Sequence, residues 1–188
     1  MFTGIITHTG SLIKKENSIY TFKTSPSLIK KLDTGTSIAI DGACLTVSKI
    51  PSKNSFAVEA MPETLKKTTL GTLKVDDIVN LELPATPSTF ISGHIVQGHV
   101  DGVGTVTKIK GGGNSRILTI SFPKDLKKYI VSKGSVAING VSLTVIKSSN
   151  NSFTVGIIPY TWEHTMFHQL KASDQVNIEV DILAKYLC

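Results

Sequence analysis

Hydrophobic and polar residues alternate over several short stretches of the chain. In Phe56–Ala60 and Leu118–Phe122 apolar side chains alternate with small or polar ones, and Val79, Leu81 and Leu83 follow the same rhythm. A period of two is typical of a strand that buries one face. The pattern therefore predicts a protein built mostly from short β-strands.

Turn and helix signals separate these stretches. Asp41-Gly42 and Asn139-Gly140 each lie between two apolar runs, which predicts tight turns with positive φ. Ser25-Pro26 offers an N-cap and a proline at the first helical position, and Pro123 begins a similar pattern in the second half. We expect one or two short helices in each half of the chain.

The chain contains an internal repeat. Ser37–Val47 returns as Ser135–Val145, 98 residues later, and Met61–Thr64 returns as Ile158–Thr161, 97 residues later. Because order and spacing persist over some ninety residues, we interpret the chain as two copies of one module. Continued toward the N-terminus, the alignment places Met1 opposite His99.

We therefore expect an all-β fold with two tandem domains, residues 1–97 and 98–188. Several short strands with a short helix, in fewer than about a hundred residues, favour a small closed barrel. Closure would also leave no sheet edge exposed.

Composition narrows the class of partner. The formal charge is +6 and the pI about 9.3, but the lysines are scattered and Arg116 is the only arginine. Nucleic-acid-binding barrels cluster positive charge beside stacking aromatics, and only 6% of these residues are aromatic. We expect neither a nucleic-acid partner nor a membrane span, since no apolar run approaches about 20 residues.

The two cysteines, Cys44 and Cys188, form no disulfide framework, and no histidine or second thiol gives zinc-ligand spacing. The first ten residues lack the basic and apolar regions of a secretory signal. We expect a reducing, cytoplasmic compartment and no metal.

Four segments together resemble riboflavin synthase of the alpha-chain type. They are Met1–Ile6, Gly42–Val47, Ser92–Gly102 and Asn139–Val145. The resemblance covers essentially the whole chain in order and includes the duplication.

The resemblance implies two six-stranded Greek-key barrels. It also implies dismutation of two molecules of 6,7-dimethyl-8-ribityllumazine, by transfer of four carbons, to riboflavin and 5-amino-6-ribitylamino-pyrimidinedione, with no cofactor or metal. The family's site lies between the N-terminal barrel of one subunit and the C-terminal barrel of its neighbour in a homotrimer. Family members continue into a longer C-terminal helix that drives assembly, whereas this chain ends at Cys188, so a truncated sequence and association by another route are the alternatives.

The family pattern assigns residues to two pockets. The first is expected to contain Gly4, Ile5, Ile6, Cys44, Leu45, Thr46, Glu59, Ala60, Met61, Pro62, Glu63 and Thr64. The second is expected to contain Gly98, His99, Val100, Lys133, Ser142, Leu143, Thr144, Gly156, Ile157, Ile158, Pro159, Tyr160 and Thr161.

The resemblance also implies chemical roles for a small set of residues, and we expect Ser37 and Thr46 to support them. His99 can relay protons near neutral pH, and Cys44 or Ser142 can hydrogen-bond the ring or guide water. Asp181 completes the candidate catalytic set.

Each of these residues has a purely structural alternative. Cys44 can be a small buried apolar residue, Ser142 the outward face of a strand, and Asp181 a cap at a strand end. We interpret His94 as structural.

A non-catalytic protein of the same fold, carrying a bound lumazine or flavin chromophore, is the rival hypothesis. A carrier needs one good pocket. Both copies here keep a Leu-Thr-Val segment preceded by Cys44 or Ser142, which favours the enzyme.

Overall fold

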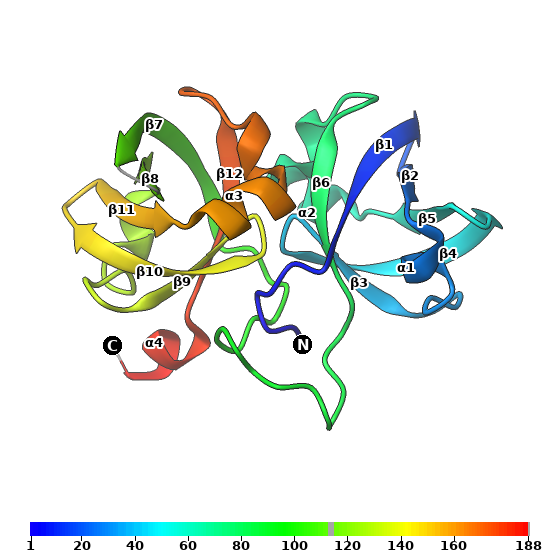
Figure 1. Cartoon of the computed structure of the whole chain (residues 1–188), viewed down its shortest axis with the longest axis horizontal. Helices are drawn as coiled ribbons and strands as arrows, with labels where there is room; N and C mark the ends of the chain where they lie inside the picture. Colours follow the sequence, from blue (N-terminus) through cyan, green and yellow to red (C-terminus); the bar gives the residue numbers. More distant parts are fainter. Residues whose placement is uncertain (113–114, 188) are drawn as a thin grey trace.

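The computed structural model describes residues 1–112 and 115–187, which form two closed six-stranded barrels. The predicted β class and the duplication are both confirmed. Figure 1 shows the barrels side by side, with β6 and β12 next to the middle of the molecule. None of the helices within the described ranges is long and apolar enough to cross a membrane.

The first barrel has the strand order β1-β2-β5-β4-β3-β6. Because β3, β4 and β5 follow one another and β6 returns beside β3, these four strands form a Greek key. Its elements are β1 (His8–Glu16), β2 (Ile19–Thr24), α1 (Pro26–Ile29), β3 (Ser37–Ile40), β4 (Ala43–Ser52), β5 (Ser55–Glu59), α2 (Pro62–Lys67), η1 (Thr69–Thr72) and β6 (Ile78–Glu82).

The second barrel repeats this topology in the order β10-β11-β8-β7-β12-β9. Where the first barrel has the predicted helix α1, capped by Ser25, the second has only the 3₁₀ turn η2 after Pro123. Its elements are β7 (Gly102–Gly112), β8 (Ser115–Ser121), η2 (Lys124–Leu126), β9 (Ser135–Ile138), β10 (Val141–Ser148), β11 (Ser152–Ile157), α3 (Pro159–His164), η3 (Met166–Gln169), β12 (Gln175–Val180) and α4 (Ile182–Leu187).

Each barrel closes around its own apolar core. Large side chains such as Phe22 and Phe56 in the first barrel, and Phe153 in the second, are almost wholly inaccessible to solvent. The alternation seen in β5 and β8 arises because every second side chain points into this core. Register shifts in β4 and β10, one residue after Val47 and Val145, bend the strands at matched positions.

The two barrels meet at the predicted tight turns. Asp41 and Asn139 both have φ of 44°, and the glycines after them have φ of 79° and 78°. A Cβ at Gly42 would lie 2.7 Å from the Gly140 nitrogen, and one at Gly140 would lie 2.8 Å from the Gly42 nitrogen. Glycine is therefore required at both positions by the close approach as well as by φ.

Two asparagines on the central strands hold the barrels together. Asn80 Nδ2 donates to the Asn139 carbonyl (2.9 Å), and Asn177 Nδ2 donates to the Asp41 carbonyl (2.8 Å). Their side-chain oxygens accept from the Met166 and Thr69 amides of the opposite barrel, at 2.7 and 2.8 Å. Each side chain thus satisfies buried backbone groups of the other domain, which fixes the relative position of the two barrels.

We predict that Asn177→Ala destabilises the protein by about 1–3 kcal/mol, because the Thr69 amide and the Asp41 carbonyl lose their partners. Urea unfolding monitored by tryptophan fluorescence measures the change. Thr107→Ala removes an exposed hydroxyl and should shift stability by less than about 0.5 kcal/mol. Equal shifts for both variants would contradict the role of Asn177.

One difference between the copies lies inside this interface. Asp41 and Asn139 occupy matched positions, and each accepts from the amide of an interface asparagine, Asn80 at 2.8 Å and Asn177 at 2.7 Å. Burial raises the pKa of Asp41 to about 7, and the nearby charge of Asp77 acts in the same direction. The first copy therefore carries a titratable group where the second carries a neutral amide.

Asp41 should make stability pH-dependent. Between its ordinary pKa of 3.8 and about 7 the folded protein holds a proton that the unfolded chain releases. Its stabilising contribution is therefore complete below pH 3.8 and is lost as the pH rises through 7. Relative to Asp41→Asn, the wild type should lose up to about 1.4 kcal/mol per pH unit in this window, measured by urea unfolding at several pH values. Asn139→Asp should introduce a similar loss, and parallel curves for wild type and Asp41→Asn would contradict the assignment.

Candidate active site

Two buried carboxylates, one at the end of β6 and one near the end of β12, anchor the segments that lead into the barrels. Glu82 accepts from the Thr3 amide and hydroxyl, both at 2.7 Å, and from the Gly4 amide at 3.1 Å. Glu179 accepts from the Gln97 and Gly98 amides, at 2.6 and 3.0 Å. We call residues 2–6 and 96–100 the entry segments. They pair with each other through two backbone hydrogen bonds between Phe2 and Val96.

Each entry segment then crosses to the other barrel. The Gly4 carbonyl accepts from the Ser142 amide of β10, and the Gly98 carbonyl accepts from the Cys44 amide of β4, both at 2.8 Å. Ile6 packs against the core of the second barrel, whereas Val100 packs against the core of the first. The entry segment of each copy is therefore a wall of the other copy's pocket.

Glycine is needed where the entry segments touch the strands. Gly4 and Gly98 have φ of 75° and 81°. A Cβ on Gly4 would lie 2.6 Å from Ser142 Cβ, and one on Gly98 would lie 2.5 Å from Cys44 Cβ.

The crossing corrects how the residues were grouped from the sequence. Gly4, Ile5 and Ile6 were expected beside Cys44, and Gly98, His99 and Val100 beside Ser142, but the structure exchanges the two segments. It also shows that Gly4 and Gly98 occupy equivalent positions in the two copies, so that Ile5, and not Met1, is the counterpart of His99. The repeat carries little residue identity before β1 and β7, so only the contacts with Glu82 and Glu179 reveal the correct alignment.

We define the first pocket as the hollow beside Cys44. This cavity of about 180 Å³ brings together six of the predicted residues and adds three that the sequence had not indicated. The predicted residues are Cys44, Glu63, Thr64, Gly98, His99 and Val100, and the additions are Ala43, Lys67 and Thr68. The imidazole of His99 is exposed, and Lys67 forms an ion pair with Glu63 at 3.1 Å. The first pocket therefore offers a thiol, an imidazole and hydrogen-bonding groups around one small space.

Other residues predicted for the first pocket lie around it or inside the barrel. Leu45 and Ala60 belong to the core, while Glu59 accepts from the Ser18 hydroxyl at 3.0 Å. Ser37 and Thr46 face each other across β3 and β4. Met61 and Pro62 are exposed at the start of α2.

We use the name second pocket for the counterpart region beside Ser142, against which Gly93 and His94 pack in this structure. Ser142 Oγ lies 2.7 Å from His94 Nδ1, and a Cβ on Gly93 would lie 2.9 Å from the same oxygen. His94 is 9% exposed, and its Nε2 is buried without a hydrogen-bond partner. Burial lowers the pKa of His94, and the negative charge of Asp181 opposes this shift. The ring is therefore neutral near pH 7, with only one of its two nitrogens carrying a proton.

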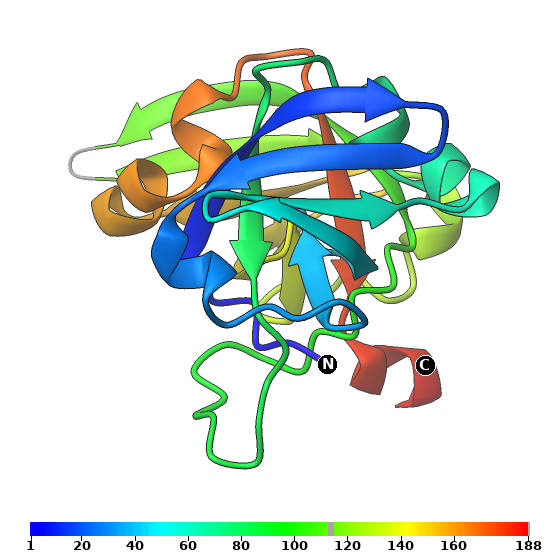
Figure 2. The same ribbon diagram turned by 90° about the vertical axis from the view of Figure 1, so that its right-hand side faces the viewer.

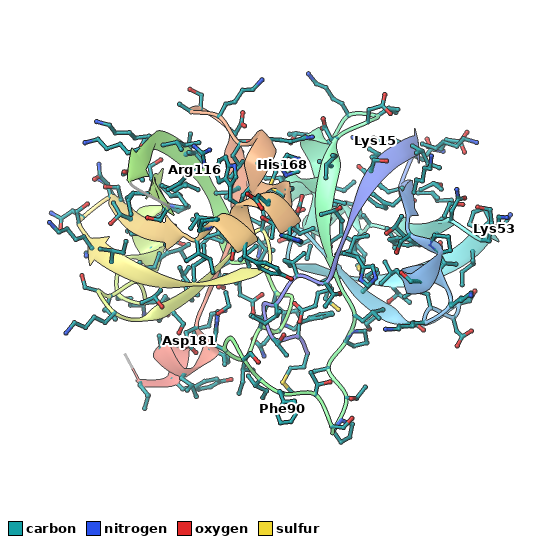
Figure 3. The ribbon with its side chains drawn as sticks, viewed as in Figure 1. Lys15, Lys53, Phe90, Arg116, His168 and Asp181 are labelled. Atoms are coloured by element: carbon teal, nitrogen blue, oxygen red, sulfur yellow. The ribbon has the colours of Figure 1, made fainter. Side chains whose placement is uncertain are left out.

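His94, interpreted from the sequence as structural, thus contacts Ser142, a side chain proposed for chemistry. Nothing in the sequence pattern indicated this contact. The Ser92–Gly102 segment contains two histidines, and its pattern singled out His99 alone. Asp181 follows β12 directly, and its Oδ1 caps α4 by accepting from the Leu183 amide at 3.0 Å. Figure 3 shows Asp181 where β12 passes into α4, at the end of the molecule that carries the entry segments.

The other residues predicted for the second pocket come from β10, β11 and α3. Leu143 and Ile157 contribute to the core, and Thr144 lies opposite Ser135 of the neighbouring strand β9. Ile158 is 58% exposed and Tyr160 stacks on His164. Gly156, Pro159 and Thr161 lie along the same strand and helix, whereas Lys133 forms a turn with φ of 70°.

Comparison with known proteins identifies this architecture. The family described as lumazine binding domain matches the chain twice, over residues 3–84 and 97–181. A riboflavin synthase of Actinobacillus pleuropneumoniae is 39% identical over 191 residues, covering 100% of this chain and 88% of that protein. The riboflavin synthase of Bacillus subtilis is 38% identical with the same coverage. The chain belongs to the riboflavin synthase family. It is therefore an enzyme, a transferase of riboflavin synthesis.

Solved structures are similar over almost their whole length. LumP complexed with 6,7-dimethyl-8-(1'-D-ribityl) lumazine superimposes with a TM-score of 0.84 at 25% identity, covering 96% of this chain and 99% of that one. LumP complexed with riboflavin has a TM-score of 0.85, with the same identity and coverage. The identity to the riboflavin synthases is higher than the identity to LumP.

We predict that Gly98→Ala destabilises this riboflavin synthase family member by about 1–3 kcal/mol, because its Cβ overlaps Cys44 and the added volume cannot be accommodated. Gly35→Ala is the matched control, since Gly35 also has positive φ (93°) but has open space around it. Its cost should stay at about 1 kcal/mol, the strain of the left-handed backbone. Urea unfolding of both variants measures the difference, and equal losses would show that contact with Cys44 does not matter.

Proposed function

We propose that the chain catalyses the dismutation of two molecules of 6,7-dimethyl-8-ribityllumazine. One molecule gives a four-carbon unit to the other, and the products are riboflavin and 5-amino-6-ribitylamino-pyrimidinedione. The observation that carries this proposal is the pair of pockets built alike from an entry segment and a β-strand, with Cys44 in one and Ser142 in the other.

The reaction joins two copies of one molecule, so two related pockets are a direct way to bind its two substrates. Holding two reactants in the correct geometry can remove about 7–11 kcal/mol of barrier. The C7 methyl group of one lumazine is acidic, because its anion delocalises into the ring, and the other lumazine must take a nucleophile at its own C7. The protein then has to supply mild acid–base chemistry and orientation.

We assign that chemistry to the polar groups that distinguish the pockets. In the first pocket, Cys44 and His99 lie beside the same cavity, where the imidazole can exchange a proton with solvent. In the second pocket, the neutral ring of His94 orients the Ser142 hydroxyl, and Asp181 contributes negative charge nearby. We expect the remaining predicted residues, including Thr46, Thr64, Thr144 and Thr161, to bind the rings and ribityl chains.

Association of chains is also part of the proposal. Large apolar side chains are exposed at the end of the molecule that carries both termini, among them Phe90, Tyr186 and Leu187 at 89, 84 and 83%. Figure 2 shows the connection between β6 and β7 extending from the barrels at this same end of the molecule, where α4 also lies. These surfaces support a homotrimer in which a first pocket faces a neighbour's second pocket. A cytoplasmic location stays a prediction.

We predict that purified protein converts 6,7-dimethyl-8-ribityllumazine into equal amounts of riboflavin and the pyrimidinedione without added cofactor. Absorbance and chromatographic separation of the products measure the reaction. Cys44→Ala and Ser142→Ala should each lower kcat/KM about 10²-fold, a typical contribution of acid–base and orienting groups, and Thr107→Ala on the outer surface should have no effect.

Tight binding of the lumazine without turnover would reject the enzyme and support the chromophore carrier, which the similarity to LumP favours. Sedimentation of the same preparation shows whether chains associate under the assay conditions. Activity in a preparation that stays monomeric would reject the site between chains.

A further inference from the structure

We propose that Glu179 and Glu82 are positioning residues that act across the barrel interface. Glu179 of the second barrel fixes a wall of the first pocket, and Glu82 of the first barrel fixes a wall of the second pocket. The inference rests on the proposed function for its consequence in catalysis, but the contacts that it concerns exist in the protein without substrate.

The two carboxylates occupy matched places and have matched partners. Glu82 is the last residue of β6 and Glu179 the last but one of β12. Both are almost fully buried (5% and 3% exposed), and both accept from the amides of two consecutive residues. In each case the second of these residues is the positive-φ glycine, Gly4 or Gly98, whose carbonyl then binds the strand of the other barrel. The same glycine therefore binds the carboxylate through its amide and the strand of the other barrel through its carbonyl.

The barrel itself does not need these carboxylates. The ladders of β6 and β12 are complete through their backbone pairing with β1, β3, β7 and β9. Burial raises the pKa of both glutamates, and the hydrogen bonds from the entry segments oppose the shift. A buried charge is often less stable than an apolar residue of similar size, so holding the entry segments accounts for acidic residues at these positions.

Apart from apolar packing of Phe2, Ile6, Val96 and Val100, the entry segments have few other hydrogen bonds. They bind each other at Phe2 and Val96, and the Thr3 carbonyl accepts from the His94 amide at 3.2 Å. Beyond these bonds, Gly4 and Gly98 contact the opposite strand at 2.8 Å. Loss of the carboxylate would therefore loosen one pocket wall and leave both barrels closed.

Cys44 provides a reporter for the first pocket. Its side chain is partly buried, and Gly98 passes so close that a Cβ there would overlap it. In a Cys188→Ser background, the rate of labelling by a thiol reagent such as DTNB measures how often the wall opens. A reporter for the second pocket comes from Ser142→Cys in a Cys44→Ser, Cys188→Ser background, since Gly4 covers Ser142 in the same way.

The experiment measures labelling of each of the two thiol reporters in each of two glutamine variants. Glu179→Gln, which keeps the shape but places an amide NH₂ against a backbone N–H, should raise labelling of Cys44 about tenfold, the loss expected for a charge-assisted hydrogen bond. It should change labelling of the residue-142 thiol by less than about twofold. Glu82→Gln should show the reverse, and Glu16→Gln, at an exposed ion pair, should change neither rate.

A crossed pattern supports the inference. Equal rises at both reporters, a rise on the same barrel as the substitution, or no rise at all would overturn it. If a glutamine variant loses its cooperative unfolding transition, Thr3→Val replaces it. That variant removes the 2.7 Å hydroxyl bond to Glu82 and the 3.3 Å bond from the Ile5 amide of the same entry segment. It should raise labelling of the residue-142 thiol alone, so that a rise at Cys44 or at neither reporter would overturn the inference.

Turnover separates this inference from the proposed function. Riboflavin formation by Glu179→Gln and Glu82→Gln should fall about tenfold in kcat/KM, in step with labelling. Crossed labelling in a protein that makes no riboflavin would leave the positioning role intact and reject the proposed function. Full activity together with an uncrossed labelling pattern would reject the positioning role and leave the proposed function intact.

Discussion

The reciprocal exchange of hydrogen bonds by Asn80 and Asn177 is the constraint on which the rest of the structure depends. Each amide satisfies backbone groups of the opposite barrel, so the two barrels, and with them β6 and β12, are held at one fixed offset. Glu82 and Glu179 lie two residues farther along these strands and are therefore placed by the same contacts. Because those carboxylates hold the entry segments, the geometry of both pockets follows from the interface between the barrels, and neither pocket is complete in an isolated domain.

We propose that the chemistry of the site comes from departures from this internal symmetry. Cys44 and Ser142 have the same backbone contact, but only Ser142 meets a buried histidine, His94. His99 adds an exposed imidazole to the first pocket, where the second has the apolar Ile5 as its counterpart. A reaction between two identical molecules requires similar binding and different treatment of each. Two copies of one module that differ at a few polar positions meet both requirements.

Much of the fold could be predicted because the responsible interactions are local. Alternation in β5 and β8, the turns at Asp41-Gly42 and Asn139-Gly140, and the cap at Ser25 each depend on a few neighbouring residues. The grouping of the entry segments could not be predicted, because it depends on contacts between residues far apart in the sequence, Gly98 with Cys44 (54 positions) and Gly4 with Ser142 (138 positions). The contact of His94 with Ser142 could not be predicted for the same reason, since the two residues lie 48 positions apart.

The sequence by itself determined the duplication, the β class and the residue types available for catalysis, because repeats and short-range periodicity are recorded directly in the order of residues. It also placed Cys44 and Ser142 at equivalent positions. Only the tertiary structure decided which entry segment covers which pocket and which histidine meets Ser142. The physical reason is that a barrel closes on itself and leaves its leading segment free to pair with whatever the barrel interface brings near, and that interface is built by buried hydrogen bonds between distant residues.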